Sequence, residues 1–166
     1  GTYLTPDETK WVVANINDIN VGMLCYTYAF SVTEDGRPSL NGNPPIAETG
    51  LCNYFDYNNL EKFYSEVEAH ISAMESAGAE TTMMFIHWGN EYVYGVTDIM
   101  RSIAMLAIDA GADMVIGTNA AGVYPIVKYK DKPIIYSLGY FIGDSDLYVG
   151  RESFIFNVNI SSEGNI

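Results

Sequence analysis

Apolar residues recur along the chain in patterns that predict two helices. The first is expected over 58–77, where apolar residues three or four positions apart share one face and Gly78 follows as a stop. That face consists of Leu60, Phe63, Tyr64, Val67, Ile71 and Met74. The second helix is expected over 97–110, because Thr97 is a suitable N-cap and Gly111 follows the last periodic residue.

Runs of apolar and aromatic residues between and after these helices predict strands. The strands are expected near 21–28, 82–87, 113–117, 124–129, 134–138 and 153–160. Their order with the helices predicts an α/β fold, in which a layered and partly parallel β-sheet has flanking helices. Residues 31–56 form a long loop rich in turn residues, and a loop of this length usually has a function or is mobile.

Length and charge narrow the function classes. The 166 residues fit a single domain over 1–166, and their formal net charge of −13 repels polyanions, so nucleic acid is not expected as a partner. No apolar run reaches the roughly 20 residues that a membrane-spanning helix needs. The chain begins with Gly1 and not with methionine, so it could be a portion of a longer polypeptide that has a leader or membrane anchor upstream.

The two cysteines allow two interpretations. Cys25 lies in the apolar run VGMLCYTY, where a free thiol would serve as a small buried hydrophobe, and Cys52 follows the long loop. A Cys25–Cys52 disulfide is the alternative in an oxidising compartment. Neither cysteine belongs to a CxxC motif, which argues against a structural zinc site.

Polar residues with catalytic potential follow one buried strand, in the sequence FIHWGNEYVYG. His87 ends this strand and Glu91 follows four residues later, so the two could ligate a metal ion or transfer protons. The alternative is a structural histidine that is hydrogen-bonded to the backbone beside Trp88. The residues alone leave both interpretations open.

Four stretches of the sequence resemble one family in the same order: VGMLCYTYAF, FIHWGNEY, IAMLAIDAGADMVIG and KPIIYSLGYF. The family is that of the capsule-synthesis proteins CapA/PgsA, which take part in poly-γ-glutamate capsule formation, and the resemblance covers roughly 18–142. It implies the calcineurin-like metallophosphatase fold, a four-layer sandwich with a dinuclear metal site at strand ends. It also implies that this chain is the second half of that domain, because the early Asp and Asn-His ligand motifs have no counterpart here.

The chain departs from the family pattern at two positions that bear on metal binding. Where the family has a histidine-rich turn similar to GHHPH, residues 117–122 read GTNAAG, and where it has YSLGNF, Tyr140 replaces the asparagine. Among the family's ligands only His87 has a match, and one imidazole cannot hold two divalent ions. The resemblance therefore implies a site loop that has lost its ligands, and no cofactor is expected in this chain.

The candidate site residues all follow strands that we expect to be neighbours. They are His87, Asn90, Glu91, Asn119 and Tyr140. Because ligands of parallel sheets bind at the carboxyl ends of strands, we expect these side chains to converge at one edge. His87 is the one candidate metal ligand, and no catalytic residue is assigned.

Two function classes remain, and the sequence leaves open whether the chain is an enzyme. The first is a non-catalytic CapA-like domain at the extracellular or cell-surface side, whose partner is an anionic polymer or the capsule-synthesis machinery. Lys128, Lys130 and Lys132 could hold such an anion, although a solvated hairpin tip is the commoner role for such residues. The second is a divalent-metal-dependent hydrolase of phosphoester or γ-glutamyl amide bonds, completed by an absent amino-terminal half.

Half of a two-sheet domain would also expose an apolar sheet face and favour self-association.

Overall fold

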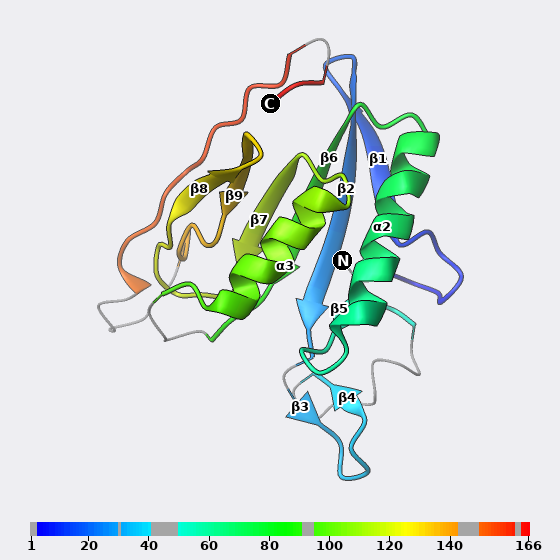
Figure 1. The fold of residues 1–166 in the computed structure, drawn as a ribbon, viewed down its shortest axis with the longest axis vertical. Coiled ribbons are helices and arrows are strands. Elements are labelled where there is room, and N and C mark those ends of the chain that lie inside the picture. The colour runs from blue at the N-terminus through cyan, green and yellow to red at the C-terminus, as the bar shows by residue number, and fades with distance from the viewer. Residues whose placement is uncertain (1–2, 30, 41–49, 91–94, 143–149, 162–163) are drawn as a thin grey trace.

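The computed structural model describes residues 3–29, 31–40, 50–90, 95–142, 150–161 and 164–166. Within these ranges one sheet has the strand order β1 (Trp11–Ile16), β2 (Ile19–Tyr28), β6 (Thr81–His87), β7 (Met114–Thr118), β9 (Lys132–Ile135) and β8 (Ile126–Tyr129), and β5 (Tyr54–Phe55) also pairs with β2. The helices are α2 (Leu60–Ser76) and α3 (Asp98–Asp109), and a small separate hairpin joins β3 (Ser31–Val32) to β4 (Pro38–Ser39) (Figure 1).

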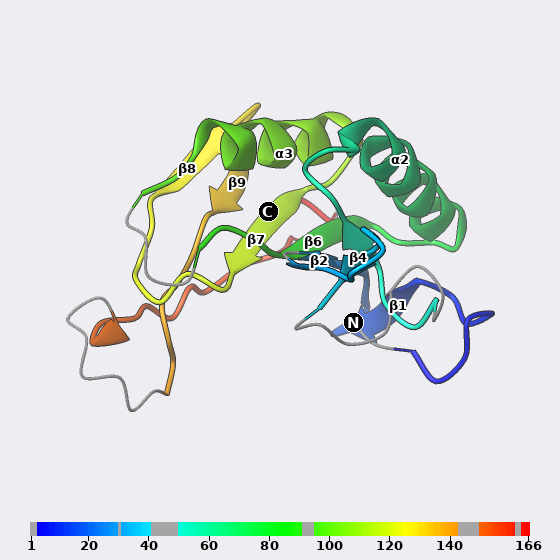
Figure 2. The ribbon, with the colours of Figure 1, turned by 90° about the horizontal axis from the view of Figure 1, so that it is seen from below.

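The centre of the sheet is parallel, and this places both helices on one face. Strands β2, β6, β7 and β9 run in the same direction, whereas β1 and β8 are antiparallel to their neighbours. The crossovers through α2 and α3 both step in the direction from β2 to β7, and right-handed crossovers that step the same way lie on the same side. Figure 2 shows α2 and α3 together above the sheet. The predicted α/β fold with a partly parallel sheet is confirmed.

The hydrophobic core fills the space between the sheet and these helices. Alternate residues of the central strands, such as Leu24, Met84 and Ile86, point to this side and are fully buried. The helices contribute Phe63, Val67, Ile71, Met74, Met100, Ile103, Ala104 and Ala107. Because the apolar spacing of the helices matches this buried face, packing of the amphipathic stripe stabilises both elements.

The opposite face of the sheet has no helix over it in the described part of the chain. Met23, Met83, Phe85 and Ile116 occupy the alternate positions of the same strands and are only half-buried. An apolar face of this kind is usual where another layer or partner packs. Self-association through it stays a prediction.

The ends of the helices agree with the sequence signals. The Thr97 side chain accepts a hydrogen bond from the backbone N–H of Met100 at 3.3 Å, which caps α3. Gly78 and Gly111 follow the two helices with φ of 93° and 115°, a conformation that other residues rarely adopt. The predicted helices over 58–77 and 97–110 are thus confirmed, with ends that differ by one or two residues.

Strand β1 is an element that the sequence analysis missed. It pairs antiparallel with β2 through a two-residue turn in which Asn17 and Asp18 have φ of 51° and 67°. Two consecutive positive φ values are typical of the type I′ hairpin turn, for which Asn and Asp are favoured. The signal was therefore present in the sequence.

The closing strand expected over 153–160 is wrong. Residues 154–160 belong to no ladder, and the segment makes one isolated bridge, between Gly139 and Ser153. Phe156, Val158 and Ile160 are half-buried and alternate with exposed Asn157 and Asn159, so the period of a strand is present. A strand also needs a neighbour for its backbone, and the described residues provide none.

The long loop expected over 31–56 contains short ordered pieces, and its residues 41–49 lie outside the described ranges. Asn53 is buried at its end and donates its side-chain N–H groups to the Lys10 and Cys25 carbonyls at 2.8 and 3.1 Å. It thereby fills the gap between β1 and β5 along the edge of β2. Cys25 and Cys52 are both free and half-buried.

We expect the His70 imidazole to make the stability of the fold depend on pH. Its Nδ1 lies 3.1 Å from the Tyr26 hydroxyl, and burial lowers its pKa below the usual 6.5. The unfolded chain therefore binds this proton more readily, so we expect the free energy of unfolding to fall as pH drops below 6.5. Denaturant titrations at pH 5–8 should show a shallower decline for His70→Gln, which keeps an acceptor for Tyr26. Parallel declines in both proteins would contradict this assignment.

Candidate functional site

The carboxyl ends of β6 and β7 bring two turns together. In the parallel ladder His87 is the register partner of Thr118, and His87 Nδ1 lies 3.4 Å from the Thr118 hydroxyl. Each strand is followed by a turn that leaves the same edge of the sheet. The turn of residues 88–90 therefore lies beside the turn of residues 119–122.

Asn119 ties these two turns to each other. Its backbone has φ of 87°, a conformation that asparagine tolerates better than most residues. Its side-chain nitrogen donates to the carbonyls of Trp88 and Gly89 at 3.1 and 3.0 Å. The Gly89 N–H in turn lies 3.4 Å from the Tyr57 hydroxyl, and burial raises the pKa of Tyr57. The amide nitrogen of Asn119 thus has a structural task.

Trp88 anchors the first turn in the core. Its side chain is fully buried, its indole N–H donates to the Tyr136 carbonyl at 3.1 Å, and the two rings stack with centroids 5.7 Å apart. Gly117 on β7 makes room for this arrangement, because a Cβ there would lie 2.2 Å from the Tyr136 carbonyl oxygen and 2.4 Å from the indole nitrogen. The interpretation of Trp88 as a structural tryptophan agrees with these contacts.

The second turn is also packed against the protein. Ala120 and Ala121 are 3% and 0% exposed, so the second half of the turn that replaces the family's histidine-rich turn holds buried methyl groups. The buried Ser137 hydroxyl donates to the Ala120 carbonyl at 3.1 Å and accepts from the Gly139 N–H at 3.1 Å. This turn is therefore part of the core and offers no charged group to a ligand.

Two apolar hollows border the edge of the sheet. Asn119 and Tyr140 line one of about 660 Å³, together with Phe154 and other apolar residues. His87 and Thr118 line the end of the other, of about 670 Å³, which runs over the helix-free face. Thr118 lines both hollows, so they meet at the position of that residue.

The structure brings together three of the five candidate residues. His87 lies against Thr118 and Asn119 donates to the Trp88 carbonyl, so these two candidates lie in neighbouring turns, and Tyr140 lines the same hollow as Asn119. Asn90 follows directly and is exposed, and the structure gives it no contact with the other candidates. Glu91 lies outside the described residues. Their joint role in a site remains a prediction.

Sequence reasoning placed Gly117 and Thr118 in the site loop of residues 117–122 but did not name either as a candidate site residue. Thr118 ends β7 opposite His87, and only the register of the ladder reveals that pairing. Gly117 lies within β7, as the strand expected over 113–117 implied, but the sequence analysis did not predict that its missing side chain accommodates Trp88. A glycine inside a strand often marks such a close approach, so this signal was available.

The described residues do not fit a dinuclear metal centre. Nowhere in the described ranges do three or more His, Cys, Asp or Glu side chains gather as a metal would require. The edge of β6 and β7 offers the His87 imidazole, the Thr118 hydroxyl and the side-chain oxygen of Asn119, while the nitrogen of Asn119 already donates to two carbonyls. A pair of divalent ions needs more donors, with carboxylates among them.

None of the helices in the described ranges has the length and apolarity to cross a bilayer.

Comparison with known proteins identifies the family. The model of the family described as bacterial capsule synthesis protein PGA_cap matches residues 1–145. The PGA biosynthesis protein CapA of Bacillus subtilis is 33% identical over 164 residues, which are 99% of this chain and 39% of the relative. The capsule biosynthesis protein CapA of Bacillus anthracis is 26% identical over 162 residues, which are 95% of this chain and 35% of the relative.

A third relative matches a shorter part of the chain. It is a Mycobacterium tuberculosis protein named as a polyglutamine synthesis accessory protein, 34% identical over 89 residues, which are 54% of this chain and 23% of the relative. The chain thus spans about two fifths of the Bacillus subtilis relative and less of the others. The family match covers most of the chain and agrees with the four ordered motifs, so this chain belongs to the bacterial capsule synthesis protein family PGA_cap.

Proposed function

We propose that this chain is a non-catalytic domain that serves poly-γ-glutamate capsule synthesis at the cell surface through contact with the synthesis machinery. The names of the relatives, PGA biosynthesis and capsule biosynthesis proteins, support the role in synthesis. The observation that carries the non-catalytic part is the packing of the turn 119–122. Its side chains are buried or engaged with the backbone at the place where the family pattern would hold metal ligands.

Several polar groups of this edge have partners within the protein, which supports a structural role for them. Asn119 holds the Trp88 and Gly89 carbonyls, Ser137 holds the Ala120 carbonyl, and Thr118 lies against His87. These contacts would have to break before the same atoms could bind a substrate through their donors. A preorganised catalytic site keeps its donors directed at the reacting group instead.

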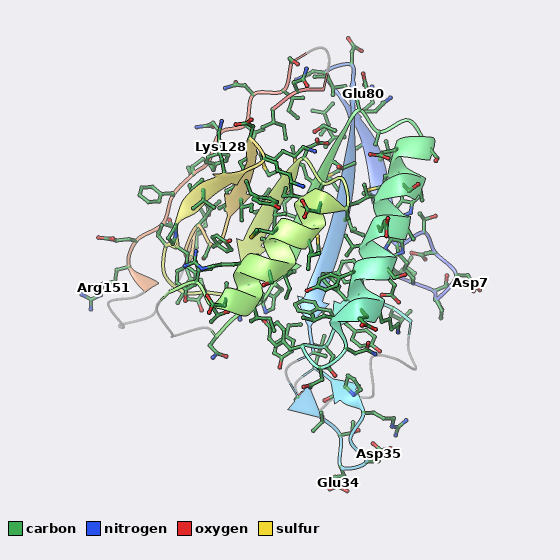
Figure 3. The ribbon with its side chains drawn as sticks, viewed as in Figure 1. Asp7, Glu34, Asp35, Glu80, Lys128 and Arg151 are labelled. Carbon is green, nitrogen blue, oxygen red and sulfur yellow. The ribbon has the colours of Figure 1, made fainter. Side chains whose placement is uncertain are left out.

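The charge distribution favours a protein partner over direct binding of the anionic polymer. The net charge is −13, and two of the three clustered lysines have carboxylate partners: Lys130 pairs with Asp109 at 2.7 Å and Lys132 with Asp113 at 3.0 Å. Lys128 lies on β8, toward the end of the sheet away from the carboxyl edge of β6 (Figure 3). A polyglutamate chain would therefore meet net repulsion at this domain.

The alternative is a metal-dependent hydrolase of phosphoester or γ-glutamyl amide bonds. One observation favours it: His87 and Thr118 lie at the carboxyl ends of parallel strands beside an open hollow, where α/β enzymes hold their ligands. In that case the missing donors would come from the part of the relatives' length that this chain does not span.

Calorimetric titration with Mn²⁺ and Zn²⁺ distinguishes the two proposals for this chain. We expect no binding with a dissociation constant in the micromolar range for the wild type or for His87→Ala, because one imidazole and neutral oxygens are weak ligands together. His70→Gln, at the only other histidine, controls for unspecific binding by imidazole. Micromolar binding that disappears in His87→Ala and persists in His70→Gln would favour the hydrolase.

A test of the role in synthesis needs the polymer itself. The test uses a capsule-forming host whose own PGA_cap protein has the same residues as this chain at the positions that match 117–122 and 140. We expect the replacement that corresponds to His87→Ala in that protein to leave the polymer yield unchanged. Surface labelling of the tagged protein tests the location. Loss of polymer with His87→Ala, at normal protein levels, would contradict the non-catalytic proposal even if metal binding were undetectable.

A further inference from the structure

The two cysteines of the chain lie where β5 joins the edge of β2, and these two strands run parallel (Figure 1). The ladder pairs Thr27 with Tyr54, and the backbone carbonyl of Asn53 accepts a hydrogen bond from the Thr27 N–H at 3.1 Å. The Asn53 side chain donates to the Cys25 carbonyl at 3.1 Å. Asn53 thus follows the edge of β2 from Thr27 back to Cys25, and it brings its neighbour Cys52 to the same place.

The register of the two strands suits a bond between these cysteines. Cys25 precedes Thr27 by two residues, and Cys52 precedes Tyr54 by two residues. Residues two positions apart on a strand point to the same side, so the register continued by two residues sets Cys25 opposite Cys52. Facing residues of neighbouring strands have Cα atoms roughly 5 Å apart, within the roughly 4.4–6.8 Å that a disulfide bond spans.

The surroundings of Tyr3 give a second sign that the two thiols are close. The Tyr3 hydroxyl accepts a hydrogen bond from the Asn53 side chain at 3.1 Å. Burial raises the pKa of Tyr3 most, and negative charge on Cys25 and on Cys52 raises it further. Burial also raises the pKa of the Cys52 thiol, and charge on Cys25 adds to that rise. Because such interactions weaken with distance, both sulfur atoms lie near the Tyr3 hydroxyl and near each other.

We propose that Cys25 and Cys52 form a disulfide bond that ties β5 to β2 when the protein meets an oxidising disulfide. One cysteine thiolate attacks a sulfur atom of the oxidant, such as oxidised glutathione, which forms a mixed disulfide and releases one thiol. The other cysteine thiolate then attacks the protein sulfur of the mixed disulfide, and the second thiol leaves. The protein loses two protons and two electrons, and the oxidant takes them up as two thiols.

The bond closes the long loop that follows β2. Residues 26–51 lie between the two cysteines and include the β3–β4 hairpin. A crosslink of this kind stabilises the fold mainly because it restricts the unfolded chain. The inference rests on the proposed cell-surface location for its oxidant, since disulfides persist outside the reducing cytosol.

Oxidation of the purified chain in glutathione redox buffers tests the proposal. Glu34 and Glu48 lie between the cysteines, so a Glu-specific protease releases the cysteines on separate peptides. Trypsin leaves both within residues 11–62, because Pro38 follows Arg37. We expect monomeric protein to yield one crosslinked pair of Glu-specific peptides, which reduction separates. The equilibrium constant for oxidation should be roughly hundredfold larger for the folded chain than in urea.

Leu51→Cys combined with Cys52→Ser is the matched control, because it moves the thiol by one residue and so turns it to the other side of the segment. This variant should form the bond roughly tenfold less readily or worse, and Cys25→Ser should form none. Thermal melts should show that the variants fold. Equal equilibrium constants in buffer and in urea would overturn the proposal, and so would crosslinks that join only separate chains.

The same experiment keeps this proposal apart from the proposed function. Bond formation in glutathione buffers does not depend on where the protein resides, so its failure would leave the role in capsule synthesis untouched. Surface labelling that finds the protein inside the cell would contradict the location and leave the measured equilibrium constant as it is. Cys25 and Cys52 would then stay reduced in the cell.

Discussion

Replacing Gly117 by alanine is expected to destabilise the protein by roughly 3 kcal/mol or more, or to prevent folding. A Cβ at this position would lie 2.2 Å from the Tyr136 carbonyl oxygen and 2.4 Å from the Trp88 indole nitrogen. Neither atom can yield easily, because one is backbone in a neighbouring segment and the other belongs to a fully buried ring. The free energy of unfolding from denaturant titration measures the effect.

Gly36→Ala separates this steric effect from the general cost of replacing a glycine. Gly36 has φ of 82°, and an added Cβ there would meet no atom within 4 Å. Its replacement should cost about 1 kcal/mol through backbone strain alone. Gly117 lies outside the positive-φ region, so its replacement should cost more for a different reason. Equal costs at the two positions would contradict the close packing around Trp88.

The sequence predicts the elements whose signals are local. For the helix Leu60–Ser76, the apolar face, the length and the glycine that follows are all signals within one continuous stretch of sequence. The Thr97 N-cap is also local, because its side chain bonds to a backbone N–H in the first turn of α3. The parallel centre of the sheet follows from the alternation of strands and helices, because right-handed crossovers leave few other arrangements. These parts of the fold need no knowledge of distant contacts.

The errors concern elements that depend on a partner elsewhere. Residues 153–160 have the period of a strand, yet the described residues supply no neighbouring backbone, and periodicity alone does not create a ladder. Strand β1 was missed for a different reason. Its turn at Asn17 and Asp18 is a recognisable hairpin signal, but the run before it is short and partly polar.

The candidate site shows the same division between local and distant information. That His87 and Asn119 lie at one edge follows from parallel strands, and the register places His87 opposite Thr118. That the Asn119 nitrogen is committed to two carbonyls, and that Ala120 is buried, depends on how two turns pack in space. No spacing in the sequence encodes such packing, so the structural use of the turn could not be predicted from the sequence.

Trp88 connects the hydrophobic core to the turns at the carboxyl ends of β6 and β7. Its replacement by alanine should lower the free energy of unfolding by about 3–5 kcal/mol. The large buried ring would leave a cavity under the turn that Asn119 holds, and the Tyr136 carbonyl would lose its hydrogen bond. Trp88→Phe keeps most of the volume and removes only the N–H, so it should cost roughly 2 kcal/mol. Denaturant titrations measure both values.

Trp11→Phe is the control for the second replacement, because Trp11 and Trp88 are the two tryptophans of the chain and Trp11 is only partly buried. Fluorescence of each single-tryptophan protein then reports on one site. We expect Trp11→Phe to change stability by less than about 1 kcal/mol, since Trp11 is not enclosed by the core. If Trp88→Phe were no more destabilising than Trp11→Phe, the hydrogen bond from the Trp88 indole to the Tyr136 carbonyl would contribute little to stability. That result would contradict the structural role assigned to the turn that follows β6.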